Sequence, residues 1–181
     1  MSERTARKLP RLAGYDYAQN GAYFVTICTH NREMLFGEIV DGNMQLNNAG
    51  EIVLTCWNDL AKHYTQAEYD AFVIMPNHVH AIVVLVEDGR VSDPSLRGAF
   101  RPTPTSPQPS PTKPHGLPQI IGSFKSFSAR RINEKRDMSG VAVWQGSYYD
   151  HIIRDEADLN IRRQYILNNP SRWQEDVEFR A

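Results

Sequence analysis

Residues 75–86, MPNHVHAIVVLV, decide the fold of this chain. The apolar, β-branched run at 81–86 is the longest in the sequence. It favours a buried β-strand, because a membrane span needs roughly 18 apolar residues. Successive side chains of a strand point to opposite faces, so His78 and His80 share one face and Val79 lies on the other. The stretch therefore predicts two imidazoles next to each other on one face of a sheet.

Aromatic and β-branched runs on both sides of this stretch predict further strands, and apolar residues at helical spacing predict helices. The expected strands lie at 22–29, 34–39, 44–46, 71–75 and 148–153, with another extended piece at 141–144. The first expected helix begins at a capping Asn47 or Asn48 and runs to about residue 64. The second covers 117 to about 135, with Ile120, Ile121, Phe124 and Phe127 facing inward. The third begins at a capping Asp155 and ends by Pro170. Strands grouped around a few helices predict an α+β fold with an antiparallel sheet.

Length and composition indicate a single globular domain over 1–181. The chain has 181 residues, of which 41% are hydrophobic and 23% charged, and its formal net charge is −1. These values exclude a disordered chain, a coiled coil and a collagen-like fibre. Seven of the 11 prolines fall at 88–116, which we expect to be a flexible insertion in the domain. No secretory signal and only two well-separated cysteines indicate a reducing, cytoplasmic setting.

The histidine pair is a candidate metal site, since imidazole suits zinc, manganese, iron and partly hydrated magnesium. An isolated pair is also compatible with structural histidines, so the metal interpretation requires a third ligand. Asn169 can supply one: it lies four residues after Tyr165 in the third helix, on the same helix face. The alternative is that Tyr165 is a half-buried tyrosine and Asn169 a helix-capping residue.

Residues 144–151, WQGSYYDH, form another stretch with functional character. Its aromatic and amide side chains can stack on nucleobases and bind their edges, or can simply pack in a strand. Tyr148 and Tyr149 are alternatives to Tyr165 as a nucleophile. Asp150 and His151 are alternatives to Asn169 as a third ligand.

Three motifs together resemble the HUH single-strand tyrosine transposases: 75–84 (MPNHVHAIVV), 144–156 (WQGSYYDHIIRDE) and 164–170 (QYILNNP). Within that family the chain is most similar to the tyrosine transposases associated with repetitive extragenic palindromes (REPs), which residues 14–39 also resemble. The resemblance covers nearly all of the chain outside 1–10 and 88–116. It implies a ferredoxin-like, RRM-like antiparallel sheet with helices packed on one side of it, the histidines on a central strand and a C-terminal helix carrying the tyrosine.

The resemblance also implies roles for individual residues. His78 and His80 become ligands of Mg²⁺ or Mn²⁺, with Asn169 as the third ligand, and Tyr165 becomes the nucleophile that attacks a phosphodiester of single-stranded DNA. The product is a 5′-phosphotyrosine link beside a free 3′ hydroxyl, on DNA that folds into a palindromic hairpin. Relatives of this kind act as monomers or as homodimers, in the bacterial cytoplasm at the nucleoid.

A net charge of −1 does not exclude a DNA partner, because binding responds to local charge. We expect DNA contacts from a basic N-terminal arm, from the basic face of the second helix and from two tyrosines. The residues are Arg7, Arg11, Lys125, Arg130, Arg131, Tyr148 and Tyr149. Two other functions stay open: a non-catalytic RRM-like nucleic-acid-binding protein, and a metal-dependent hydrolase in which His78 and His80 activate water.

Overall fold

Four strands form one antiparallel sheet in the order β4-β5-β1-β6. Their bounds are β1 Gly21–Cys28, β4 Ala67–Met75, β5 His78–Leu85 and β6 Tyr149–Ile153. This computed structural model describes residues 15–86, 116–176 and 178. The expected proline-rich insertion at 88–116 therefore lies outside the described residues except for Gly116, and Arg7 and Arg11 also lie outside them. The histidine-bearing strand is central, as predicted.

The order of elements along the chain matches the ferredoxin-like pattern. Two β-α-β units, β1-α1-β4 and β5-α2-β6, supply the sheet, where α1 is Asn48–His63 and α2 is Leu117–Arg136. A hairpin of β2 (Gly37–Val40) and β3 (Asn43–Leu46) is inserted between β1 and α1. The predicted α+β class with an antiparallel sheet is confirmed.

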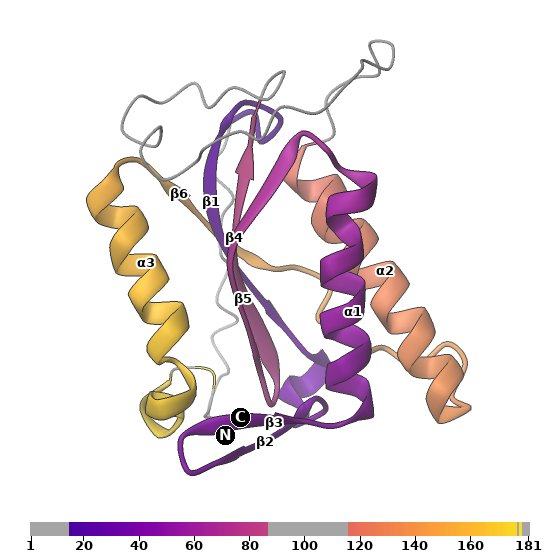
Figure 1. The fold of residues 1–181 in the computed structure, drawn as a ribbon. Coiled ribbons are helices and arrows are strands. Elements are labelled where there is room, and N and C mark those ends of the chain that lie inside the picture. Colours follow the sequence, from indigo (N-terminus) through magenta and orange to yellow (C-terminus); the bar gives the residue numbers. More distant parts are fainter. Residues whose placement is uncertain (1–14, 87–115, 177, 179–181) are drawn as a thin grey trace, which may run out of the picture.

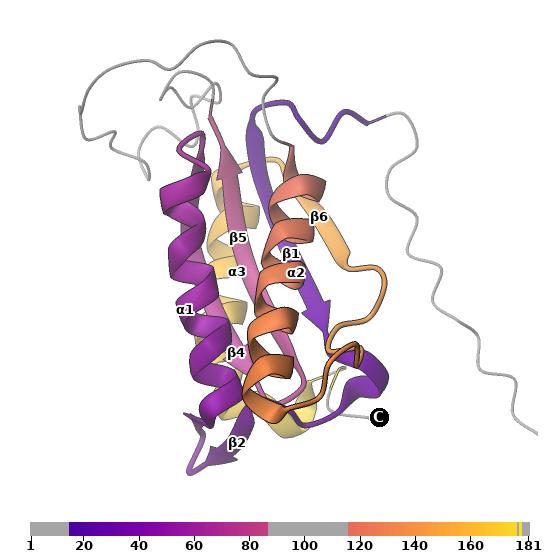
Figure 2. The same cartoon turned by 90° about the vertical axis from the view of Figure 1, so that its right-hand side faces the viewer.

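Helices cover both faces of the sheet, and not one side alone as the resemblance implied. In Figures 1 and 2, α1 and α2 lie on one face, and α3 (Glu156–Asn168) lies on the other. The alternation of strand side chains assigns each residue to a face: on β5, Val79, Ala81 and Val83 join the core under α1 and α2. Their neighbours Ile82 and Val84 pack in a separate cluster with Leu159 and Ile166 of α3. His78 and His80 lie at even-numbered positions of β5, like Ile82 and Val84, and therefore face the α3 side.

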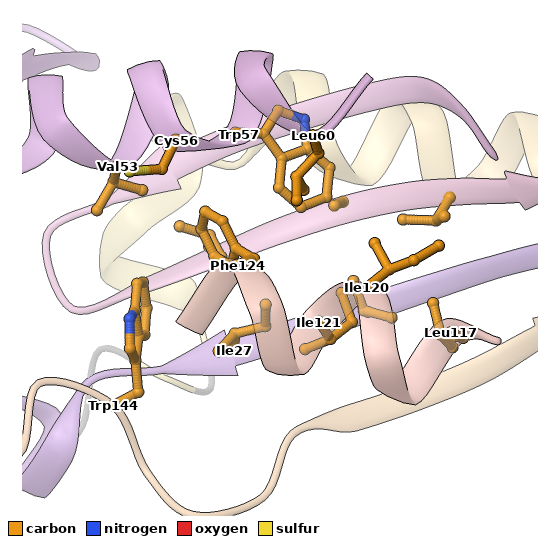
Figure 3. Close-up of a cluster of buried hydrophobic side chains, with 14 of the residues drawn as sticks. Ile27, Val53, Cys56, Trp57, Leu60, Leu117, Ile120, Ile121, Phe124 and Trp144 are labelled. Carbon is orange, nitrogen blue, oxygen red and sulfur yellow. The ribbon is translucent and has the colours of Figure 1, made fainter. Parts of the chain in front are cut away.

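The larger core lies between the sheet and the helix pair α1 and α2 (Figure 3). Trp57 of α1 stacks on Phe72 with ring centroids 4.4 Å apart, and it meets Phe124 of α2 edge-on at 5.3 Å. Phe124 is fully buried, so truncation to Ala removes about 3–5 kcal/mol of stability. This layer holds the sheet against its two helices independently of α3.

The prediction that Phe127 faces inward is wrong, since 47% of its surface is exposed. The inward position is taken by Ser128, whose hydroxyl accepts a 2.9 Å hydrogen bond from the indole of Trp144. Phe127 lies at the edge of the apolar stripe and instead packs beneath the guanidinium of Arg130. Trp144 forms only an isolated bridge with Thr29, so the extended piece expected at 141–144 is not a strand.

Side-chain caps fix the beginnings of two helices, as predicted. The Asn47 side chain accepts hydrogen bonds from the backbone N–H groups of Ala49 and Gly50. Asp155 does the same for Asp158 at the beginning of α3. After α3, Pro170 begins a short 3₁₀ segment, η2 (Pro170–Glu175), and a second such segment, η1 (His30–Arg32), follows β1. Within the described ranges, no helix has the length and apolar composition to cross a membrane.

Candidate metal centre and its tyrosine

The two histidines of β5 lie buried beneath α3. His78 is fully buried and His80 is 2% exposed, and their Nε2 atoms approach to 2.9 Å. Phe24 of β1 stacks on the His80 ring, and Trp173 of η2 lies beside the His78 ring at 5.8 Å. The predicted pairing of the imidazoles on one face is confirmed, and apolar rings enclose the pair.

Neighbouring polar groups fix the orientation of both imidazoles. The Asn77 amide nitrogen donates to the backbone oxygens of Glu178 and Arg32, which leaves its carbonyl oxygen to accept from Nδ1 of His78 at 2.8 Å. Nε2 of His78 therefore carries a lone pair. Nδ1 of His80 lies 2.8 Å from the hydroxyl of Thr26. Such outer partners position the rings of metal-binding histidines.

Asp176, directly after η2, completes a buried group with the histidines. One potential ligand atom from each of His78, His80 and Asp176 lies within 4.8 Å of the other two, and all three residues are buried. An Oδ atom of Asp176 lies 3.9 Å from Nε2 of His80. Two imidazoles and a carboxylate form a donor set that can hold a divalent metal ion. No sequence motif singles out Asp176, because its position depends on the turn that η2 makes after Pro170.

Tyr165 and Asn169 face this group from α3, four residues apart on one side of the helix as predicted. The Tyr165 hydroxyl donates a 3.0 Å hydrogen bond to Asp176, and the Asn169 amide donates one of 2.6 Å to the same oxygen. The Tyr165 ring lies 5.1 Å from the His80 ring. The carbonyl oxygen of Asn169 is buried and has no hydrogen-bond partner among the described residues. The structure thus brings together all four residues that the sequence motifs singled out.

An ion pair holds α3 in place on the sheet. Arg163 donates two hydrogen bonds to the carboxylate of Asp70 on β4, at 2.7 and 2.9 Å. Both side chains are at most one-quarter exposed, and the bidentate geometry defines the position of the helix closely. Arg163 lies two residues before Tyr165, so this ion pair also positions the tyrosine.

Burial sets the protonation of the group. Burial, and then proximity to His80, hold the pKa of His78 well below its usual range, and burial lowers the pKa of His80. Burial alone would raise the pKa of Asp176, but the contacts with His80 and Asn169 outweigh it and lower the pKa to about 2. Burial and the Asp176 charge raise the pKa of Tyr165 to about 12. At neutral pH the group therefore holds neutral imidazoles, a carboxylate and a protonated phenol.

None of the residues proposed as alternatives belongs to the buried group of His78, His80 and Asp176. His151 of β6 is 2.7 Å from Asp158 and is engaged with that carboxylate. Asp150 points to the opposite face of β6 from His151. Tyr149 packs edge-on against Phe24, whereas Tyr148 packs against the core under α1 and α2. Among the described His, Cys, Asp and Glu residues, the only close group of metal-ligand type is the one containing Asp176.

The basic residues of α2 lie on the other side of the sheet from Tyr165 (Figure 2). Lys125 binds the backbone oxygens of Gln145 and Gly146, which anchors the loop before β6. Arg131 lies 3.4 Å from Asp59 of α1, and Arg130 is 64% exposed beside Glu134. The basic residues of α2 and the metal centre therefore lie on separate surfaces of the molecule.

An open pocket of about 570 Å³ adjoins the centre, between α3 and η2. Tyr165, Asn169 and Asp176 form one wall, and Ile161, Gln164 and Asn168 line it along α3. Tyr165 is 39% exposed, whereas the histidines behind it are buried. Tyr165 is thus the residue of the centre that a molecule in the pocket meets first.

Comparisons with known proteins identify similar chains in sequence and in fold. No model of a known protein family matches the chain. An uncharacterized protein of Haemophilus influenzae is 39% identical over 175 residues, which cover 94% of this chain and 91% of the relative. A second protein of that organism, named "Putative REP-associated tyrosine transposase", is 27% identical over 155 residues, covering 86% of this chain and 73% of its own.

A solved structure of a REP-associated tyrosine transposase bound to a REP hairpin has the same fold. It superposes with a TM-score of 0.51 and 19% identity, over 88% of this chain and 72% of that chain. This chain shares the ferredoxin-like sheet of that solved structure, and its sequence is similar to that of a protein named as a transposase. The chain is thus similar to the REP-associated tyrosine transposases in sequence and in fold.

Proposed function

We propose that this protein cleaves and rejoins single-stranded DNA next to a palindromic hairpin, through a covalent link to Tyr165. The observation that carries the proposal is the hydrogen bond from Tyr165 to Asp176, which attaches a partly exposed phenol to a buried two-histidine group. The relative solved with a REP hairpin supports DNA as the substrate class. A single domain, acting as a monomer or homodimer, suffices for this chemistry.

The residues of the centre fit a divalent ion such as Mg²⁺ or Mn²⁺. His78 directs an Nε2 lone pair toward His80, Asp176 supplies negative charge, and the Asn169 carbonyl oxygen is buried without a partner among the described residues. We assign His78, His80 and Asn169 as ligands, with Asp176 as a further one. When bound, the ion holds the scissile phosphate and neutralises the charge that develops on it.

The side chains of the protein position the nucleophilic hydroxyl of Tyr165. With a pKa of about 12, Tyr165 is protonated at neutral pH, and its hydroxyl is held by Asp176. In the cleavage step the bond from Tyr165 Oη to phosphorus forms while the bond from phosphorus to the 3′ oxygen breaks. The phenolic proton is lost, and the leaving oxygen gains a proton to become a 3′ hydroxyl. Attack by that hydroxyl on the phosphotyrosine reverses the step, so rejoining needs no nucleotide cofactor.

The direct test is covalent capture. The wild-type protein is incubated with Mg²⁺ or Mn²⁺ and a pool of labelled, hairpin-bearing single-stranded oligonucleotides with randomised flanks, and the products are then denatured. We expect a protein–DNA adduct that survives denaturation, that Tyr165→Phe abolishes, and that the matched Tyr149→Phe variant retains. Cleavage without an adduct would instead support the metal-dependent hydrolase. Binding without cleavage in either metal would support the non-catalytic RRM-like protein.

A further inference from the structure

Three amide side chains follow one another along α3 next to the nucleophile. Asn160, Gln164 and Asn168 are spaced by four residues, so they form one row on the helix. All three line the pocket of about 570 Å³, together with Tyr165. This volume falls in the range of about 300–1,000 Å³ that small-molecule pockets occupy.

Two of these amides have unused hydrogen-bonding capacity. Asn160 accepts a 3.3 Å hydrogen bond from Arg163. The side chains of Gln164 and Asn168 are exposed and form no hydrogen bond with another residue in the described part of the chain. Each amide offers both donors and an acceptor, and such groups recognise the edges of nucleobases.

The charges of the lining favour a neutral ring over a phosphate in this pocket. Arg172, the cation of the lining, is engaged by Glu175 at 2.6 Å, and Asp176 adds a carboxylate at the inner wall. A phosphate there would meet an excess of negative charge. Ile161, which is 64% exposed, supplies an apolar surface for a flat ring next to Tyr165.

We propose that this pocket binds one nucleobase flanking the scissile phosphate, and that Gln164 and Asn168 read its edge. The inference rests on the proposed function, since it takes the strand that reaches Tyr165 to be DNA. It assigns a specificity site to α3 that is separate from the metal ligands. A bidentate amide–base contact discriminates between bases by about 1–3 kcal/mol, or about 5- to 150-fold.

Sequencing of cleaved strands tests this assignment. The same randomised hairpin pool is cleaved by the wild type, by the Gln164→Ala/Asn168→Ala double variant and by Gln119→Ala, an exposed glutamine on α2. The strands are then sequenced on both sides of the cut. We expect the wild type and Gln119→Ala to share a preference of at least about fivefold for one base at one flanking position. The double variant should lose the preference at that position and keep those at all others.

Two results would overturn the inference: an unchanged base profile in the double variant, or a profile altered equally at every position. Thermal unfolding of each variant shows whether an altered profile reflects loss of folding. If no protein cleaves the pool, the proposed function is wrong, and the base site is tested separately by sequencing the strands bound by Tyr165→Phe, with and without the two amides. If Tyr165→Phe selects a base only when Gln164 and Asn168 are present, the inference is supported. If its base selection does not depend on these two residues, the inference is wrong.

Discussion

The hydroxyl of Tyr165 and the amide of Asn169 both donate to a single oxygen of Asp176, which lies 3.9 Å from Nε2 of His80. One carboxylate oxygen therefore links the α3 residues to the β5 histidines. Asp176 comes from a third segment, after η2, so three separate pieces of chain meet at this oxygen. Removal of its charge changes the centre without removing any of the residues found by sequence motif.

We expect Asp176→Asn to lower the affinity for Mn²⁺ by at least tenfold, because the variant keeps the shape of the side chain but loses a charged ligand. Calorimetric titration with the metal alone measures this. Glu175→Gln is the matched control, since Glu175 is exposed, pairs with Arg172 and is not part of the buried group. Equal affinities of wild type and Asp176→Asn would remove Asp176 from the ligands.

Stability of the metal-free protein should fall as the pH drops below about 6.5. His78 and His80 have lowered pKa values in the folded state, so the unfolded chain takes up protons first. Each histidine contributes a slope of up to about 1.4 kcal/mol per pH unit. Asp176 adds a further loss as the pH falls from its unfolded pKa of about 3.9 toward about 2.

Urea unfolding in EDTA at pH 7.5, 6.5 and 5.5 measures this dependence. His80→Gln should flatten it, whereas His63→Gln, at an exposed position on α1, should leave it unchanged. The assignment fails if stability is constant across this range, or if His63→Gln flattens the dependence as much as His80→Gln does.

Asp70→Asn should lower the free energy of unfolding by about 1–2 kcal/mol, because it weakens the bidentate contact that holds α3 on the sheet. The adduct should also form more slowly, since Arg163 positions the helix that carries Tyr165. Chemical denaturation and a time course of adduct formation measure the two effects. Glu38→Gln, at an exposed position on β2, is the control and should change neither. Full stability of Asp70→Asn would mean that packing alone positions α3.

The double variant Arg130→Ala/Arg131→Ala should weaken DNA binding and reduce the slope of log affinity against log salt by about 1–2. Because α2 lies across the sheet from Tyr165, cleavage at saturating DNA should keep its rate. Fluorescence anisotropy at several salt concentrations measures the slope, with Lys62→Ala on α1 as control. An unchanged slope would exclude this face from the DNA-binding surface.

Local rules predicted most of the fold and part of the centre. The caps at Asn47 and Asp155, the shared face of His78 and His80, and the four-residue spacing of Tyr165 and Asn169 all follow from neighbours in sequence. The place of Asp176 in the centre does not follow from its neighbours in sequence. No periodicity relates Asp176 to β5, and only the η2 turn brings it next to the histidines. The predicted inward orientation of Phe127 is wrong for a related reason. Ser128 takes the inward position, and its hydroxyl accepts a hydrogen bond from the indole of Trp144, which lies 17 residues after Phe127.

The arrangement of helices on both faces of the sheet has a consequence for how such a protein evolves. The aromatic layer of Trp57, Phe72 and Phe124 maintains the fold from one face, while the candidate metal ligands and the tyrosine lie on the other. Substitutions on the α3 side can therefore leave the scaffold intact. Under the proposed function, the loss of a few side chains from this one surface would leave a protein that binds DNA without cutting it.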